Sequence, residues 1–255
     1  MANLAPSVGW GLAIAASLMV GGAIAAVLKL PERLAARITA FGGGVLLAAI
    51  ALELVPEADE RAGLVPTALG LLAGTLIFVA ADAYLSRDEE MRDMRRSGHA
   101  AAAGREMSMP QAPEGAARGE SIAAGIFVDG VPESVALGLT IAEGAIGVAL
   151  LVGVLVGNVV EAYGAAQPIV ASGRSRRFAL TLLAAIGLAL AFATVLGATV
   201  LADASDTLIG TAEGVAAGAV LAVVSISVIP YAFAEVSSGV ATATVLGFIG
   251  GYLLS

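Results

Sequence analysis

Long apolar runs alternate with short polar segments along most of the chain. A transmembrane helix needs about 20 predominantly apolar residues, and eight runs come close to this length or exceed it. They cover roughly residues 7–28, 34–55, 65–85, 119–141, 145–170, 178–201, 209–230 and 238–254. The pattern therefore predicts an all-α polytopic membrane protein, in which eight transmembrane helices form a single transmembrane domain over residues 1–255.

Composition supports this class and adds two details. The mean hydropathy is +0.93 and 13% of the residues are charged, whereas soluble domains have about 25% charged residues. Residues 1–28 lack a basic segment at their start, so we expect a retained span and not a cleaved signal. Residues 86–118, which are rich in Arg, Glu, Ala, Gly and Pro, are predicted to form a disordered loop between spans three and four.

Basic residues indicate how the helices are oriented. Of the 13 basic residues, all except Arg61 fall in alternate loops and therefore on one side of the membrane. Because Lys and Arg collect in cytoplasmic loops, this side, including loop 86–118, is predicted to be cytoplasmic. The protein is then expected in the plasma membrane, with both termini outside the cell. The outer side is predicted to carry an acidic rim that includes Glu57 and Glu213.

Two spans contain carboxylates at helical spacing. Asp129 and Glu133 are four residues apart in span four, and Asn158 and Glu161 are three apart in span five; each pair therefore shares a helix face. A charge at membrane depth costs about 3 kcal/mol or more, so such residues indicate function. Pro132 removes a backbone donor and leaves a carbonyl oxygen without its helical partner. Together these oxygens predict a cation site on a transport path.

Similar segments recur in the two halves of the chain. Gly44 precedes Pro56 by twelve residues, and Gly218 precedes Pro230 by the same interval. Residues 67–74 likewise resemble residues 244–251. By the orientation above, the related spans cross the membrane in opposite directions. We therefore expect an inverted repeat of spans 1–3 and 6–8 around spans 4–5, an arrangement typical of transporters.

These motifs resemble those of the ZIP (ZRT/IRT-like) family of divalent metal transporters, of which the chain looks like a divergent, prokaryote-like member. Pro132 and Glu133 match the family motif of span four, and Glu161 matches that of span five. Asp129 stands where the family has His, and Gly130 stands where it has Asn. The chain thus lacks the usual intramembrane histidines.

The resemblance implies a ZIP-like fold that moves a divalent cation into the cytoplasm. It implies a primary metal site, to which we add Asn158 as an oxygen ligand, and a weaker set of residues along the path. The metal residues are Asp129, Glu133, Asn158 and Glu161, and the path residues are Glu53 and Glu57. A second metal site of the family is not expected, because Gly130 and Gly157 lack ligand side chains.

The donor set bears on the choice of ion. The chain has no cysteine, and its one histidine, His99, lies in loop 86–118, so an intramembrane site must use oxygen ligands. Such ligands suit manganese and magnesium, whereas imidazole suits zinc and iron; zinc also binds carboxylates. Together with the resemblance, which implies a transported divalent metal, the expected cargo is Zn, Mn, Fe or a similar ion. Its occupancy should depend on pH, because protons compete for the same oxygens.

Two other functions use the same residues. The chain could be a non-transporting ZIP-like metal sensor or scaffold, which the missing His and Asn ligands favour, or a carrier of another cationic solute or of protons. No catalytic motif is found, so an enzyme is not predicted, and neither is a covalent cofactor. The expected partners are divalent metal ions and the lipid bilayer, without nucleic acid, and the sequence leaves a homodimer open.

Overall fold

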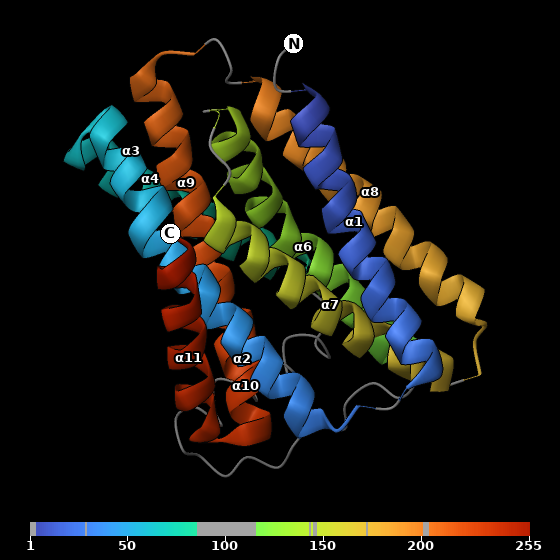
Figure 1. The fold of residues 1–255 in the computed structure, drawn as a ribbon. Helices are drawn as coiled ribbons and strands as arrows, with labels where there is room; N and C mark the ends of the chain where they lie inside the picture. Colours follow the sequence, from blue (N-terminus) through green and yellow to red (C-terminus); the bar gives the residue numbers. More distant parts are fainter. Residues whose placement is uncertain are drawn as a thin grey trace.

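All regular structure that the computed structural model describes is helical. The model describes residues 4–28, 30–85, 116–142, 144, 147–171, 173–200 and 204–255. The first helices are α1 (Leu4–Val27), α2 (Glu32–Ala49), η1 (Ile50–Leu54), α3 (Val55–Ala62) and α4 (Leu64–Leu85). They are followed by α6 (Ala116–Ala142), α7 (Val148–Ala171), α8 (Arg176–Val200), α9 (Asp206–Val223), η2 (Val224–Val228), α10 (Ile229–Val236) and α11 (Gly239–Leu254) (Figure 1).

Seven of these helical segments are long and apolar enough to cross a bilayer. This is the architecture of a multi-pass membrane protein, as the apolar runs predict. The eighth expected span, over residues 238–254, is the apolar helix α11, which has 16 residues. At 1.5 Å per residue, α11 is about 24 Å long, somewhat less than the ~30 Å of a hydrocarbon core.

Two helices extend beyond the predicted ends of their spans, which lay at residues 55 and 230. The second span continues past Pro56 to Ala62, and the seventh continues past Pro230 to Val236. In each case a five-residue π-helix, η1 or η2, comes directly before the turn that contains the proline. A proline ring collides with the carbonyl four residues earlier in an α-helix. The wider π-turn gives the backbone another hydrogen-bond pattern at this point, so the helix is not interrupted.

Helix α6 begins three residues earlier than expected, at Ala116, and so takes in the last residues of the predicted loop 86–118. The rest of that loop, residues 86–115, lies outside the described residues.

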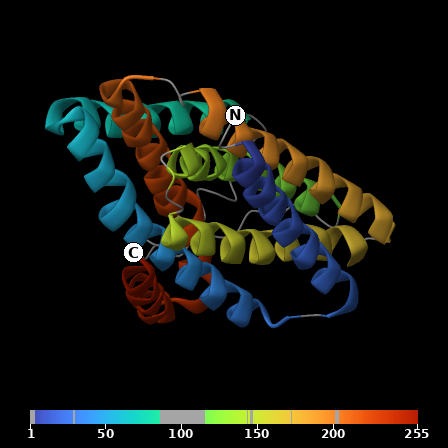
Figure 2. The ribbon, with the colours of Figure 1, turned by 45° about the horizontal axis from the view of Figure 1, so that its top comes forward.

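The helices pack in two groups. Helices α1, α6, α7 and α8 pack against one another, while α2, α3, α4, α9, α10 and α11 form the second group (Figures 1 and 2). Figure 1 shows that the α2–η1–α3 helix and the α9–η2–α10 helix run in opposite directions. The two groups meet where α2 and α11 contact α7, and where α9 contacts α6.

Glycines bring the backbones of the second group together. A Cβ at Gly44 in α2 would collide with the carbonyl of Thr244 in α11, and a Cβ at Gly218 in α9 would collide with the carbonyl of Leu71 in α4. The hydroxyl of Thr75 in α4 donates a hydrogen bond of 3.1 Å to the carbonyl of Gly218. Small residues that allow such close approach are typical of helix interfaces in membranes.

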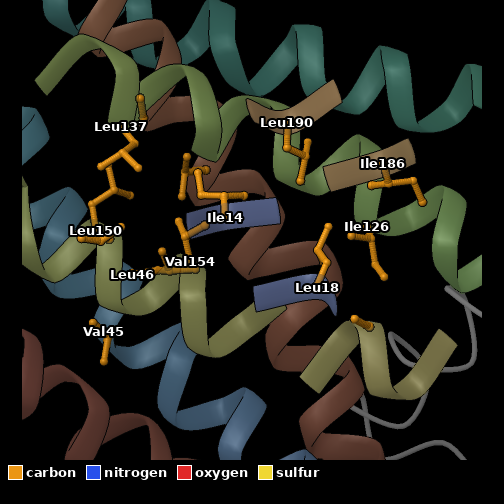
Figure 3. Close-up of a cluster of buried hydrophobic side chains, with 14 of the residues drawn as sticks. Ile14, Leu18, Val45, Leu46, Ile126, Leu137, Leu150, Val154, Ile186 and Leu190 are labelled. Atoms are coloured by element: carbon orange, nitrogen blue, oxygen red, sulfur yellow. The ribbon is translucent and has the colours of Figure 1, made fainter. Parts of the chain in front are cut away.

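The contact between the two groups is a packed apolar core. Leu46 of α2 lies over Gly153 of α7, where a Cβ would be 2.8 Å from the leucine side chain. Figure 3 shows buried side chains from five helices, α1, α2, α6, α7 and α8, which converge around this contact. The labelled residues are Ile14, Leu18, Val45, Leu46, Ile126, Leu137, Leu150, Val154, Ile186 and Leu190.

Candidate cation site

Helix α6 carries the first pair of carboxylates in its interior. The helix runs from Ala116 to Ala142 without a break at Pro132, so Asp129 and Glu133 lie one turn apart on the same face. Both residues are only 7% exposed. The sequence prediction that they share a helix face therefore agrees with the structure, which also shows that both are buried.

Helix α7 carries the other two candidate residues. Asn158 is 2% exposed, and Glu161, one turn later, is half-buried. The Nδ2 atom of Asn158 is buried, and no described residue gives it a hydrogen-bond partner. An amide left unsatisfied in this way is uncommon in protein interiors, and it lies in the same helix as Glu161.

The carboxylates of the two helices act on one another. Glu133 is within electrostatic reach of both Glu161 and Asp129, and Glu161 is also within reach of Asp129. Helices α6 and α7 pack side by side, which explains why groups about 30 residues apart in the chain come so close. Three like charges in an apolar surrounding repel one another, so the arrangement favours a cation or bound protons.

The carboxylates do not surround a common point. Among the described residues, no three His, Asp or Glu side chains are close enough together to hold a metal ion. The four candidate residues therefore form a loose group, and they would have to move towards one another to provide three ligands to one ion.

The face of α7 that carries Glu161 borders open space. A Cβ added at Gly157 or at Gly164 would have no described atom within 4 Å. These glycines lie four residues before and three residues after Glu161 and so share its face. Gly130 of α6 differs, because a Cβ there would be 2.7 Å from the side chain of Leu190 in α8. Position 130 thus faces an apolar side chain, which gives no support to a second metal site there.

The two predicted path residues lie in the second span. Glu53 is in η1 and is half-buried, and its Oε1 atom accepts a hydrogen bond of 3.4 Å from the backbone N–H of Ala149 at the start of α7. Glu57 is in α3, half-buried, and is within electrostatic reach of Glu53. The structure therefore places Glu53 against α7 and Glu57 one turn further along the same helix.

Sequence reasoning missed one buried polar group beside the site. Ser134, which follows Glu133, is fully buried, and its hydroxyl has no hydrogen-bond partner among the described residues. Its polar side chain within an apolar run was the signal that could have identified it.

The prediction that Glu213 lies on an acidic rim was wrong in one respect. Glu213 in α9 is fully buried, and its Oε1 atom is 3.7 Å from Nε of Arg61 in α3. Gly210, one turn earlier in α9, allows the close approach, because a Cβ there would be 2.8 Å from the carbonyl of Ala58. Arg61, the one basic residue outside the basic loops, is thus the ion-pair partner of a buried carboxylate.

No protein-family model and no curated protein matches this chain. The resemblance to the ZIP family therefore rests on the sequence motifs alone.

Proposed function

We propose that the chain is a ZIP-like transporter that moves a divalent cation across the plasma membrane into the cytoplasm. In this proposal the chain has eight spans, with α11 as the eighth, and both termini lie outside. The cation binds between α6 and α7 through Asp129, Glu133 and Glu161, with Asn158 as a further oxygen donor. Glu57 and the open space beside Gly157 and Gly164 lie along its route.

The observation that carries this proposal is the set of three interacting carboxylates in the interior of two apolar helices. Asp129 and Glu133 are almost completely buried, and both are electrostatically coupled to Glu161. Helix packing alone does not need three acidic groups so close together, since each carries a large cost in an apolar surrounding. A cation that binds them offsets that cost.

Contacts that recur at a constant separation support the inverted repeat. The π-helices η1 and η2 begin at Ile50 and Val224, 174 residues apart, and Gly44 and Gly218 have the same separation. Gly44 in α2 contacts the backbone of α11, and Gly218 in α9 contacts the backbone of α4. Each glycine thus packs against the helix that follows the span of the other glycine. Two halves related by a pseudo-twofold axis make such reciprocal contacts.

The first and sixth spans make a second reciprocal contact. A Cβ at Gly11 in α1 would be 3.0 Å from Cα of Ala191 in α8, and a Cβ at Gly187 in α8 would be 2.9 Å from Cα of Ala15 in α1. Gly11 and Gly187 are 176 residues apart, as are Ala15 and Ala191. In ZIP-like transport, the site on α6 and α7 would lie between these repeats, where inverted-repeat transporters bind their substrates.

The residues give a simple sequence of events. An entering divalent cation draws Asp129, Glu133 and Glu161 towards it and replaces its water by carboxylate oxygens. Three carboxylates exceed the charge of one divalent ion, so one of them can keep a proton. When the cation leaves, the remaining charges repel, and protonation again lowers that repulsion. Transport is then driven by ion gradients, because the chain has no nucleotide-binding motif.

Uptake into proteoliposomes tests the proposal. The wild-type protein, the Glu133→Gln/Glu161→Gln variant and the matched Glu60→Gln variant, which changes an exposed carboxylate of α3, are reconstituted at equal density. Uptake of Mn²⁺, Zn²⁺, Cd²⁺, Fe²⁺, Co²⁺ and Mg²⁺ is followed at two pH values. We expect saturable uptake of at least one ion, its loss in the double variant, and wild-type uptake in Glu60→Gln.

The other outcomes separate the alternatives. Folded, inserted protein that binds a divalent metal but transports none would favour a sensor or scaffold. Uptake of an organic cation or of protons, without metal uptake, would favour a carrier for another solute. Equal uptake by the wild type and the double variant would reject the assigned site.

A further inference from the structure

Helix α7 begins without a polar side chain of its own. Its first residues are Val148, Ala149 and Leu150, and the position before them is Gly147. The first backbone N–H groups of a helix have no partner within it, and an Asp, Asn, Ser or Thr at the preceding position usually accepts hydrogen bonds from them. In an apolar bundle, where water is scarce, unsatisfied N–H groups are costly.

Two other helices supply the missing acceptors. The Oε1 atom of Glu53 accepts a hydrogen bond of 3.4 Å from the N–H of Ala149, and the N–H of Leu150 interacts with the same carboxylate. The hydroxyl of Thr140 in α6 accepts a hydrogen bond of 3.4 Å from the N–H of Gly147. Ala149 and Leu150 occupy the second and third positions of the helix, to which an N-cap side chain normally bonds.

The glycine before α7 fits this arrangement. A Cβ at Gly147 would be 2.9 Å from Oε2 of Glu53, so a larger residue would push against the carboxylate. Gly147 has no positive φ, so an L-amino acid could adopt its backbone conformation. The absence of a side chain therefore makes room for Glu53.

We propose that Glu53 is the N-cap of α7, supplied from another helix, and that it positions the cation-binding residues of α7. The carboxylate replaces the side chain that α7 lacks and holds the start of α7 against η1. Because a helix is stiff over three or four turns, this contact also sets the depth and rotation of Asn158 and Glu161. This second part rests on the proposed transport function, whereas the cap itself does not.

Helix α7 has a second attachment beyond the site. The backbone N–H of Leu30 donates a hydrogen bond of 2.6 Å to the hydroxyl of Tyr163, which is 7% exposed. Glu53, which binds Ala149, and Leu30, which binds Tyr163, thus hold α7 on either side of Asn158 and Glu161. Fixing both flanks of a segment restricts its rotation, as a preorganised site requires.

The substitution Gly147→Ser distinguishes a role of Glu53 as a helix cap from a role as a metal ligand. In Glu53→Ala the N–H groups of Ala149 and Leu150 lose their acceptor, and the space beside position 147 becomes free. In Glu53→Ala/Gly147→Ser a hydroxyl can accept those hydrogen bonds, but no carboxylate is restored. A cap role therefore predicts recovery in the double variant, whereas a path-ligand role predicts none. Glu53→Gln keeps an acceptor oxygen without charge, and Glu60→Ala, which changes an exposed carboxylate of α3, is the matched control.

Hydrogen exchange, followed by mass spectrometry on the full chain in lipid nanodiscs, reads the cap directly. We expect exchange in peptides that contain residues 148–151 to be about fivefold faster or more in Glu53→Ala, which corresponds to loss of one N-cap. Exchange should return to the wild-type rate in Glu53→Ala/Gly147→Ser and should stay close to it in Glu53→Gln and Glu60→Ala. Unchanged exchange in Glu53→Ala would overturn the cap.

Uptake of Mn²⁺, or of the ion that the wild type transports, tests whether Glu53 positions the cation-binding residues of α7. We expect KM to rise in Glu53→Ala with a smaller change in kcat, and to recover in the serine double variant and in Glu53→Gln. Recovery of exchange without recovery of uptake would overturn positioning and make Glu53 a ligand on the path. A wild-type protein without uptake would contradict the proposed function, while the exchange experiment would still decide the cap.

Discussion

At the scale of single residues, the identity of one ligand sets the preferred ion of the proposed site. Asp129 is buried on α6 beside Glu133 and offers oxygen where the ZIP motif offers an imidazole nitrogen. Imidazole suits zinc better than manganese. We therefore expect Asp129→His to raise the ratio of Zn²⁺ to Mn²⁺ uptake by about tenfold, which corresponds to about 1.4 kcal/mol.

Competition uptake in proteoliposomes checks this expectation. Asp206→His is the control, because Asp206 is exposed at the start of α9. A ratio that rises equally in both variants would show that a histidine anywhere on the protein suffices, and an unchanged ratio in Asp129→His would remove Asp129 from the site.

The ion pair between Arg61 and Glu213 permits a prediction about stability. Removing one partner of a buried pair leaves an uncompensated charge and costs about 3–5 kcal/mol. The side chain of Arg61 is 26% exposed, so we expect Arg61→Leu to cost about 3 kcal/mol, at the lower end of this range. In Arg61→Leu/Glu213→Leu neither charge of this pair remains, and most of the stability should return.

Thermal unfolding in detergent distinguishes the two Arg61 variants. The double variant should unfold at a temperature close to that of the wild type, well above that of Arg61→Leu. If both variants lose the same stability, the pair matters for its packing and not for its charge.

The sequence identified the residues of the candidate site but not their surroundings. Asp129 and Glu133 were recognisable because a carboxylate in an apolar run is unusual. The role of Glu53 was not, since its partner Ala149 is 96 residues away in the chain. The burial of Glu213 was hidden for the same reason, because Arg61 belongs to another span. Contacts between distant segments depend on packing, which local patterns do not contain.

At the scale of elements, the turn between α10 and α11 contains a strained residue. Ser237 has φ 50° and ψ −130°, a conformation that L-residues adopt at a cost of about 1–3 kcal/mol. The turn after α3 uses Gly63, with φ 82°, at the corresponding position. We expect Ser237→Gly to stabilise the protein by about 1 kcal/mol, after the entropic cost of glycine in the unfolded chain.

The neighbouring serine is the matched control for this turn. Ser238 has φ −60° and makes no side-chain capping hydrogen bond, so Ser238→Gly should be neutral or slightly destabilising. Thermal unfolding of both variants in the same detergent measures the difference. Stabilisation of equal size in both would contradict the strain argument.

The π-helices show what element prediction could not supply. Apolar runs located most spans within a few residues, but the second and seventh helices continue to Ala62 and Val236, beyond the runs that predicted them. A π-turn is rare in proteins and has no strong local signature. The predicted span ends near Pro56 and Pro230 were therefore too early, because a π-helix before each proline lets the helix continue.

At the scale of the whole molecule, the glycines between helices determine how closely the helices approach. A Cβ at Gly218 would collide with the backbone of Leu71 in α4, and neither backbone can move away without shifting a helix. We expect Gly218→Ala to cost about 3 kcal/mol, at the upper end for overpacking. Gly44→Ala should cost a similar amount, since Gly44 makes the corresponding contact with α11.

Gly9→Ala supplies the control for these glycines. Gly9 is exposed on α1, and a Cβ there would have no described atom within 4 Å. Alanine favours helix formation over glycine by about 1 kcal/mol, so this variant should be neutral or slightly stabilised. Thermal unfolding of the three variants checks the order, and a Gly218→Ala protein as stable as Gly9→Ala would contradict the packing argument.

The helical class and most spans could be predicted because hydropathy reports directly on burial in lipid. The division into two helix groups could not, since alanine- and glycine-rich helices resemble one another in composition. Which helix packs on which depends on individual glycines such as Gly153, which accommodates Leu46 of α2.

The partnership of α2 with α11 has a consequence for biogenesis. Gly44 lies early in the chain, whereas its contact Thr244 lies in the last described helix. Ribosomes add residues in order, and a domain with contacts between distant segments must wait for the later one. The glycine surface of α2 therefore enters the bilayer well before its partner has been synthesised. During that interval, lipid or a membrane chaperone has to cover it, and the nascent protein completes its packing only after α11 has been inserted.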